Sequence, residues 1–190
     1  MKIIPINSQI YLKPLSLDMS NDVCKFIIEN YDHLAPWFEW LGPNYTEKET
    51  IDFITRSMEQ DQIISGFNLA IIVDDKYAGT VGNHGISPMH NSTSLGYYLG
   101  KEYEGKGIML NSVRAVIQYL YDELKIERLE IRCNVDNKKS RSVPERLGFQ
   151  LEGNFRNAER VKGKYRDWAI YGMISDDYRK NRETLLKINI

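Results

Sequence analysis

The alternation of apolar and polar positions predicts β-strands along most of the chain. Apolar side chains at every second residue are typical of a strand with one face in the core. Asp74, Asp75 and Lys76 separate two such runs by a short polar turn, which predicts a hairpin. The predicted strands are residues 10–12, 67–73, 77–86, 94–99, 129–134, 150–155 and 165–174.

Apolar residues spaced three and four positions apart predict helices between these strands. Ser20 is the expected N-cap of the first helix, and Thr46 to Glu49 form a capping box at the start of the second. Residues 34–43 hold two tryptophans between prolines and fit neither a helix nor a strand. The predicted helices cover residues 20–31, 46–58, 108–124 and 140–147, and a further short helix lies in the polar tail after Ser175.

The order of these elements predicts the fold class. One strand is followed by two helices, three strands, a helix, a strand, a helix and two further strands. Consecutive strands favour antiparallel hairpins, whereas the long helix between Leu99 and Leu129 favours a crossover to a parallel neighbour. We therefore expect an α/β protein with a mixed sheet flanked by helices. The 190 residues fit a single domain that spans the chain.

Composition narrows the function classes. Charged residues make up 27% and the formal net charge is −1, whereas a dedicated nucleic-acid binder usually carries a clear basic excess. Two distant cysteines and three scattered histidines predict no metal cluster. Polar residues near Met1 interrupt any signal peptide, and no segment approaches the roughly 20 apolar residues of a membrane span. We therefore expect a cytoplasmic protein without a metal and without direct nucleic-acid or membrane partners.

Two polar segments are candidates for ligand binding. Gly105 and Gly107 stand between a predicted strand and the long helix, where a close backbone and free helical N–H groups suit a pyrophosphate. An ordinary glycine turn is the alternative, since the segment is neither a Walker loop nor a complete dinucleotide fingerprint. The second segment runs from Asn137 to Phe149, where Asn137 or Ser140 can cap the short helix.

Together these segments resemble the GNAT acetyltransferase superfamily, and within it the RimJ/RimL branch of ribosomal-protein N-terminal acetyltransferases. Residues 104–109, Glu-Gly-Lys-Gly-Ile-Met, are similar to the pyrophosphate loop of the family, and residues 137–149 are similar to its second cofactor motif. Residues 34–37, 151–153 and 163–171 are similar to further segments of this branch. The similarity therefore spans most of the chain.

The resemblance implies an enzyme, an N-acetyltransferase that moves the acetyl group of acetyl-CoA to a primary amine by direct attack in a ternary complex. It implies a GNAT-like sheet that splays between the strands at residues 96–99 and 129–134, with acetyl-CoA in the gap. The cofactor-binding residues that it implies are Leu99, Gly105, Lys106, Gly107, Ile108, Met109, Asn134, Asn137 and Ser140.

The resemblance also implies catalytic roles. Ser140 matches the proposed proton donor to the leaving thiolate, and Glu159 matches the proposed base. A base is needed because an α-amine has a pKa of about 8 and must lose a proton to attack. His84 is a rival base, since an unperturbed histidine titrates near neutral pH. Structural roles stay open for all three residues, and Cys133 is not expected to act as a nucleophile because direct transfer needs no acyl-enzyme.

The acceptor side is expected to include Trp37, Phe38 and His84, although core packing is the alternative for the two aromatic residues. The preferred acceptor is the α-amine of a protein N-terminus. A small amine, such as a polyamine or an aminosugar, is the first alternative, and a non-catalytic acetyl-CoA-binding module is the second. A homo-oligomer is compatible with the sequence.

Overall fold

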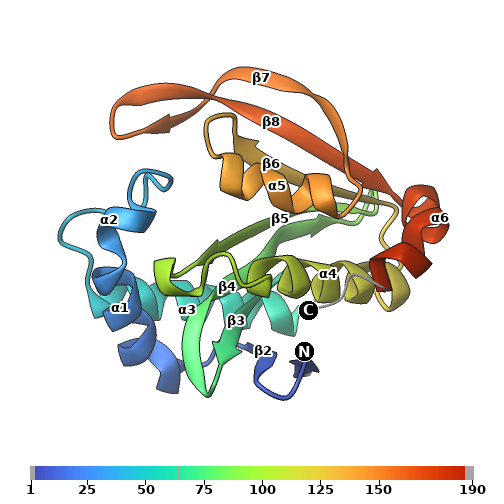
Figure 1. Ribbon diagram of the computed structural model, residues 1–190. Helices are drawn as coiled ribbons and strands as arrows, with labels where there is room; N and C mark the ends of the chain where they lie inside the picture. Colours follow the sequence, from blue (N-terminus) through green and yellow to red (C-terminus); the bar gives the residue numbers. More distant parts are fainter. Residues whose placement is uncertain (1–2, 64, 187–190) are drawn as a thin grey trace.

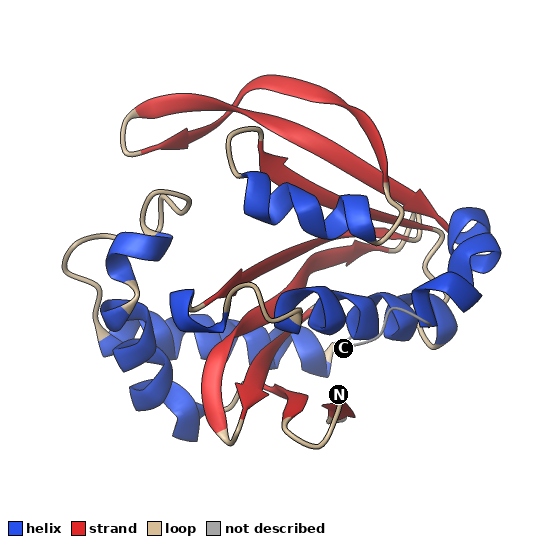
Figure 2. Cartoon of the chain, in the orientation of Figure 1, coloured by secondary structure: helices blue, strands red, loops and turns tan. Residues whose placement is uncertain are grey.

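A computed structural model describes residues 3–63 and 65–186 and shows an eight-stranded sheet with helices on both faces (Figures 1 and 2). The strand order is β1-β2-β3-β4-β5-β6-β8-β7, and among these described strands only β5 and β6 pair in parallel. The predicted mixed sheet is therefore confirmed. The strands are β1 (Ile4–Pro5), β2 (Ile10–Pro14), β3 (Phe67–Val73), β4 (Lys76–Ser87), β5 (Ser92–Leu99), β6 (Arg128–Asn134), β7 (Gln150–Val161) and β8 (Lys164–Ile174).

Within residues 3–63 and 65–186, six α-helices pack on this sheet as two groups. Buried side chains of α1 to α3 form one apolar cluster with one face of the sheet, and those of α4 to α6 form a second cluster with the other face. Among the described helices, none is long and apolar enough to cross a membrane. The helices are α1 (Ser20–Glu29), α2 (Tyr31–Leu34), α3 (Glu47–Gln62), α4 (Ile108–Asp122), α5 (Lys138–Arg146) and α6 (Ser175–Leu186).

The helix boundaries confirm one predicted cap and correct another. The Thr46 N–H donates to the Glu49 carboxylate at 2.8 Å, so the capping box at the start of α3 is present. Ser20 is not a cap, because it is the first residue of α1 and its hydroxyl donates to Glu47 Oε1 at 2.9 Å. α1 also ends earlier than the apolar spacing predicts, and Tyr31 begins α2 instead.

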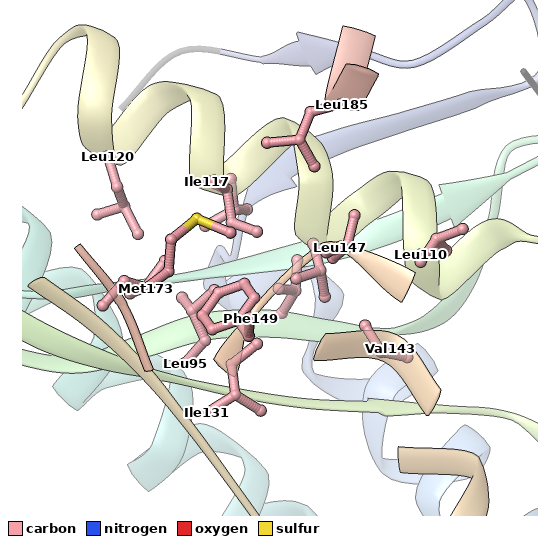
Figure 3. Packing of buried hydrophobic residues seen from close by; sticks show 14 of the residues in the cluster. Leu95, Leu110, Ile117, Leu120, Ile131, Val143, Leu147, Phe149, Met173 and Leu185 are labelled. Atoms are coloured by element: carbon pink, nitrogen blue, oxygen red, sulfur yellow. The ribbon is translucent and has the colours of Figure 1, made fainter. Parts of the chain in front are cut away.

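The larger core fixes the place where the parallel strands meet. Leu95 of β5 lies opposite Ile131 of β6, and both side chains are buried under Phe149 and the inner face of α4 (Figure 3). Ile117 and Leu120 supply that face of α4. Burial of apolar surface on this scale is the main force that holds a helix on a sheet. The crossover from β5 through α4 to β6 is therefore anchored at this layer.

Beyond Leu95 and Ile131, the strands β5 and β6 separate. Their pairing covers residues 92–95 and 128–131 only, while β5 stays paired with β4 and β6 stays paired with β8. Figure 1 shows β5 and β6 close together at one end and apart at the other. The predicted splay is confirmed, but it begins after Ile131 and not at Leu129. Residues 96–99 and 132–134 therefore face each other across a gap with unpaired backbone edges.

Candidate active site

The loop before α4 adopts a backbone that requires glycine. Gly105 and Gly107 have φ angles of 74° and 73°, in the left-handed region that side chains disfavour. Gly107 is the N-cap of α4, and no side chain in the described part of the protein caps this helix. The first N–H groups of α4 are therefore available to bind an anion, at the positive end of the helix dipole.

The predicted loop residues differ in what their side chains do. Ile108 is 3% exposed and belongs to the core, so its contribution to a ligand is limited to its backbone N–H. Met109 is half-buried against the same core, and the exposed Lys106 places Nζ 5.9 Å from the ring centroid of Tyr103. The backbone thus forms the candidate anion site, and Lys106 is a flexible cation beside it.

One edge of the gap carries an unsatisfied side-chain donor. Asn134 is buried at the end of β6, where its Oδ1 accepts the Asp136 N–H at 3.0 Å. Among the described residues, its Nδ2 has no hydrogen-bond partner. Leu99 ends the opposite strand edge and packs partly against the core. A buried amide donor without an acceptor is costly, so the gap suits a ligand with carbonyl groups. The pantetheine arm of coenzyme A has two amides and fits this donor set.

Ser140 and Asn137 take separate roles on α5. Asn137 Oδ1 accepts the Ser140 N–H at 3.0 Å, so Asn137 is the helix cap and Ser140 is not. Ser140 Oγ donates to Cys133 Sγ at 3.2 Å, and Tyr97 donates its hydroxyl to the Ser140 carbonyl at 2.9 Å. Tyr97 lies on the part of β5 that no longer pairs with β6, so this contact joins the two sides of the gap. The Ser140 hydroxyl is therefore already directed at a sulfur atom in the gap.

Burial shifts the acidity of two groups in this cluster. It raises the pKa of the Cys133 thiol and raises that of the Tyr97 phenol well above its usual value. Both shifts favour the protonated forms of these groups. A protonated thiol is a poor nucleophile, which agrees with the expectation that Cys133 is not catalytic.

Glu104 connects the loop before α4 to α5 and to α2. Glu104 Oε2 accepts a hydrogen bond from Lys139 Nζ of α5 at 2.5 Å, and its Oε1 lies 3.5 Å from His33 Nε2. Arg141 is used internally, since its Nε donates to the Tyr171 hydroxyl at 2.9 Å and its Nη1 donates to the Val135 carbonyl. Arg141 is thus held by hydrogen bonds within the protein. Lys139 would have to break its hydrogen bond with Glu104 in order to bind a phosphate.

Glu159 lies on β7, opposite Arg166 of β8. A register shift between Phe155 and Glu159 marks a bulge in this strand, and the Glu159 side chain is half-buried. Its carboxylate has no ion pair or hydrogen bond with the residues that the structure describes, and it does not touch Ser140. The two residues predicted to be catalytic are therefore on different elements, and a substrate would have to connect them.

His84 lies on β4 at the base of the gap, on the face opposite α4. Its ring covers Gly96, where an added Cβ would stand 2.5 Å from the ring Cε1. Its Nδ1 is 3.2 Å from Ser94 Oγ. Removal of water from the ring and the charge of Arg132 lower the pKa of His84 below 6.5. The imidazole is therefore neutral near pH 7 and can accept a proton.

The aromatic segment 34–43 lies on the same face as His84 and is irregular, as predicted. The Phe38 ring centroid lies 6.0 Å from that of Tyr98, which belongs to the part of β5 that does not pair with β6. Trp37 lies under the guanidinium of Arg166. The Cζ atom of Arg166 is 6.0 Å from the ring centroid of Trp37. Lys162, in the turn between β7 and β8, donates its Nζ to the Leu41 carbonyl at 2.5 Å. This segment and the β7–β8 hairpin thus enclose one side of the gap.

Sequence reasoning missed Tyr97 and Arg166. Tyr97 is one of 12 tyrosines and Arg166 one of 25 basic residues, so composition does not single either out. Tyr97 follows Gly96 at the point where the strand edge becomes free, which is the only local signal for it. Across residues 3–63 and 65–186, no three His, Cys, Asp or Glu side chains are grouped so that they could hold a metal ion.

Comparison with known proteins decides the family. The acetyltransferase (GNAT) domain matches residues 9–150. The chain belongs to the GNAT acetyltransferase family. The ribosomal-protein-serine acetyltransferase of Escherichia coli K12 is 25% identical to this GNAT protein over 173 residues, which cover 91% of this chain and 97% of the relative.

Solved structures of GNAT enzymes share the fold. The ribosomal α-N-protein acetyltransferase RimL, in complex with coenzyme A, has a TM-score of 0.87 and 27% identity, and the match covers 93% of this chain and 99% of RimL. The self-immunity acetyltransferase MccE, in complex with acetyl-CoA and AMP, has a TM-score of 0.85 and 31% identity, and the match covers 89% and 94% of the two chains. This GNAT protein is therefore an acyltransferase, and acetyl-CoA is the donor that its relatives imply.

Proposed function

We propose that this GNAT enzyme transfers the acetyl group of acetyl-CoA to the α-amine of a protein N-terminus. The observation that carries the proposal is the gap between β5 and β6, which has a free helix N-terminus at one end and aromatic and basic side chains at the other. The first end suits a cofactor phosphate, and the second suits a polypeptide. We propose further that the chain acts as one catalytic domain.

The cofactor side is built from the loop before α4 and the edges of the gap. The N–H groups that follow Gly105 and Gly107 hold the pyrophosphate, and Asn134 and the edge at Leu99 pair with the pantetheine amides. RimL has been solved with a disulfide between coenzyme A and one of its cysteines. Cys133 of this chain lies in the gap beside Ser140, which supports a path that brings the cofactor sulfur to Ser140. Acetyl-CoA supplies the activated acetyl group when it is bound.

Two side chains divide the proton transfers. Ser140 donates its hydroxyl proton toward the leaving sulfur, and Tyr97 holds the Ser140 backbone in place through the 2.9 Å hydrogen bond. Glu159 accepts the proton that the amine loses, directly or through water. His84 is the second candidate for that base, because its neutral imidazole lies on the acceptor face.

Aromatic and arginine side chains on the acceptor side favour a polypeptide. The side chains here include Arg166 above Trp37 and Arg132 above Trp168, and Lys162 closes the hairpin onto residues 39–41. Aromatic and arginine side chains are the types most enriched where proteins bind other polypeptides.

A side-by-side acceptor screen tests the proposal. The enzyme is supplied with acetyl-CoA and with N-terminal peptides, polyamines or aminosugars, and release of coenzyme A is followed for each. We expect the highest kcat/KM for peptides with a free α-amine. A higher value for a polyamine or an aminosugar would assign the first alternative. Cofactor binding without turnover of any acceptor would assign a non-catalytic acetyl-CoA-binding module.

A further inference from the structure

Arg166 has an unusual environment on the acceptor side. Its Nε is buried and, within the described residues, has no hydrogen-bond acceptor. Its Nη1 lies 3.6 Å from Asp136 Oδ2, but the Asp136 side chain is 71% exposed, and an ion pair this open to water contributes little. A buried guanidinium N–H without an acceptor costs free energy. The Nε–H of Arg166 can therefore donate a hydrogen bond to an oxygen atom of a bound molecule.

The position of Arg166 relates this capacity to the acceptor. Arg166 lies two residues before Trp168 on the same face of β8, and Trp168 is opposite Asn134 at the end of β6. Its guanidinium stacks on Trp37 of the irregular segment, so the contact spans the opening between the hairpin and that segment. An acceptor that reaches the gap from this side has to part Trp37 from Arg166, which exposes Nε.

The hairpin around Arg166 carries a local positive charge that the whole chain lacks. Residues 154–167 contain five basic and two acidic residues, whereas the formal net charge of the chain is −1. Lys164 lies on the same face as Arg166 and has no ion-pair partner in the described part of the protein. A positive opening attracts acceptors of opposite charge.

We propose that Arg166 forms a subsite for a carboxylate on the acceptor, the side chain of an Asp or Glu within the first few residues after the acetylated amine. An arginine binds a carboxylate with two parallel N–H groups, which neither lysine nor glutamine can do. The inference rests on the proposed polypeptide acceptor and names its chemical class.

Paired peptides test the subsite. Two peptides share a free α-amine and all residues except the third and fourth, which are Asp in one and Asn in the other. For the unaltered enzyme we expect kcat/KM to be about tenfold higher for the acidic peptide, the size of one charge-assisted hydrogen bond. Arg166→Gln should bring this ratio to about 1, and Arg166→Lys should leave a smaller preference because the charge remains without the fork.

Lys164→Gln is the matched control, because it removes one positive charge from the same face without removing the stacked guanidinium. It should keep most of the preference, and all variants should keep the KM for acetyl-CoA. Equal kcat/KM for the two peptides with the unaltered enzyme would overturn the subsite and leave the proposed function intact, and this comparison needs no variant to fold. Loss of the preference in Lys164→Gln but not in Arg166→Gln would also overturn it.

A small acceptor separates the subsite from the proposed function. The amides of aspartic acid and asparagine carry the same two side chains on a single amino acid. If neither peptide is acetylated while the aspartic acid amide is preferred and Arg166→Gln removes that preference, the polypeptide acceptor is wrong and the carboxylate subsite stands. If no acidic acceptor of either kind is preferred, the subsite is wrong.

Discussion

At the scale of single residues, Asn137 and Ser140 at the start of α5 have different roles. Asn137 caps the helix through Oδ1, while the Ser140 hydroxyl lies 3.2 Å from the Cys133 sulfur. Sequence alone left the cap and the donor open, because both residues sit at the start of the same predicted helix. Only the packing of α5 against β6 separates the two roles.

Ser140→Ala and Asn137→Ala should therefore differ in stability. Loss of the Asn137 cap should lower the free energy of unfolding by about 1 kcal/mol, the usual cost of an N-cap. Ser140→Ala should leave the free energy of unfolding nearly unchanged but lower kcat by about 10²-fold with little change in KM, the sign of an interaction made in the transition state. Denaturant unfolding and steady-state kinetics measure both. A normal kcat in folded Ser140→Ala would remove Ser140 as the donor.

Glu159→Gln and His84→Gln separate the two candidate bases. Glutamine keeps the size of glutamate and cannot accept the proton, so Glu159→Gln should lower kcat by about 10²- to 10⁴-fold. The KM for acetyl-CoA should stay close to normal, and His84→Gln should retain most of the rate. The reverse pattern, measured at saturating acceptor, would assign the base to His84.

His84 should also leave a signature in the pH dependence of stability. The pKa of His84 in the folded protein lies below 6.5, its ordinary value in the unfolded chain. Between these two pKa values the unfolded chain binds more protons at His84 than the folded protein does. The stability that depends on neutral His84 is complete above about pH 6.5 and is lost as the pH falls through the folded-state pKa. The difference in unfolding free energy between the unaltered protein and His84→Gln should therefore decrease from pH 7.5 to pH 5. No change in this difference would contradict the lowered pKa of His84.

At the scale of elements, hydrophobic periodicity predicted the strands and helices well wherever packing on one face sets the pattern. It failed where local chemistry ends an element. The apolar spacing of α1 continues to Tyr31, but Asn30 stops the helix by donating its Nδ2 to the Phe26 carbonyl and accepting the Lys101 N–H. β7 extends to Val161, beyond the predicted end at Phe155, because a bulge and two exposed faces conceal its alternation.

The loop before α4 gives a prediction at this scale. Gly107→Ala and Gly163→Ala both place a side chain at a positive φ, 73° and 79°, with no close backbone contact. Each should cost about 1 kcal/mol of stability, the penalty of a left-handed residue with a Cβ. Only Gly107→Ala should weaken coenzyme A binding, because Gly163 lies in the distant β7–β8 turn. Calorimetry with coenzyme A measures this, and equal affinity for both variants would remove the phosphate site from the loop.

At the scale of the whole molecule, the splay of the sheet places the proposed chemistry. Its existence was predicted from the resemblance to the GNAT family and not from the strand patterns, since nothing in the alternation of 94–99 or 129–134 marks where pairing stops. The register shows that pairing ends at Leu95 and Ile131. The acceptor side was less predictable, because Trp37 and Arg166 are brought together only by the long β7–β8 hairpin.

The location of the acetyl group on a product peptide tests the central claim most directly. A peptide with a free α-amine and one internal lysine is incubated with the enzyme and acetyl-CoA, and fragment masses locate the added acetyl group. A second peptide differs only in a blocked N-terminus. We predict one acetyl group on the α-amine of the first peptide and none on the second. Acetylation of the internal lysine in both peptides would contradict the account.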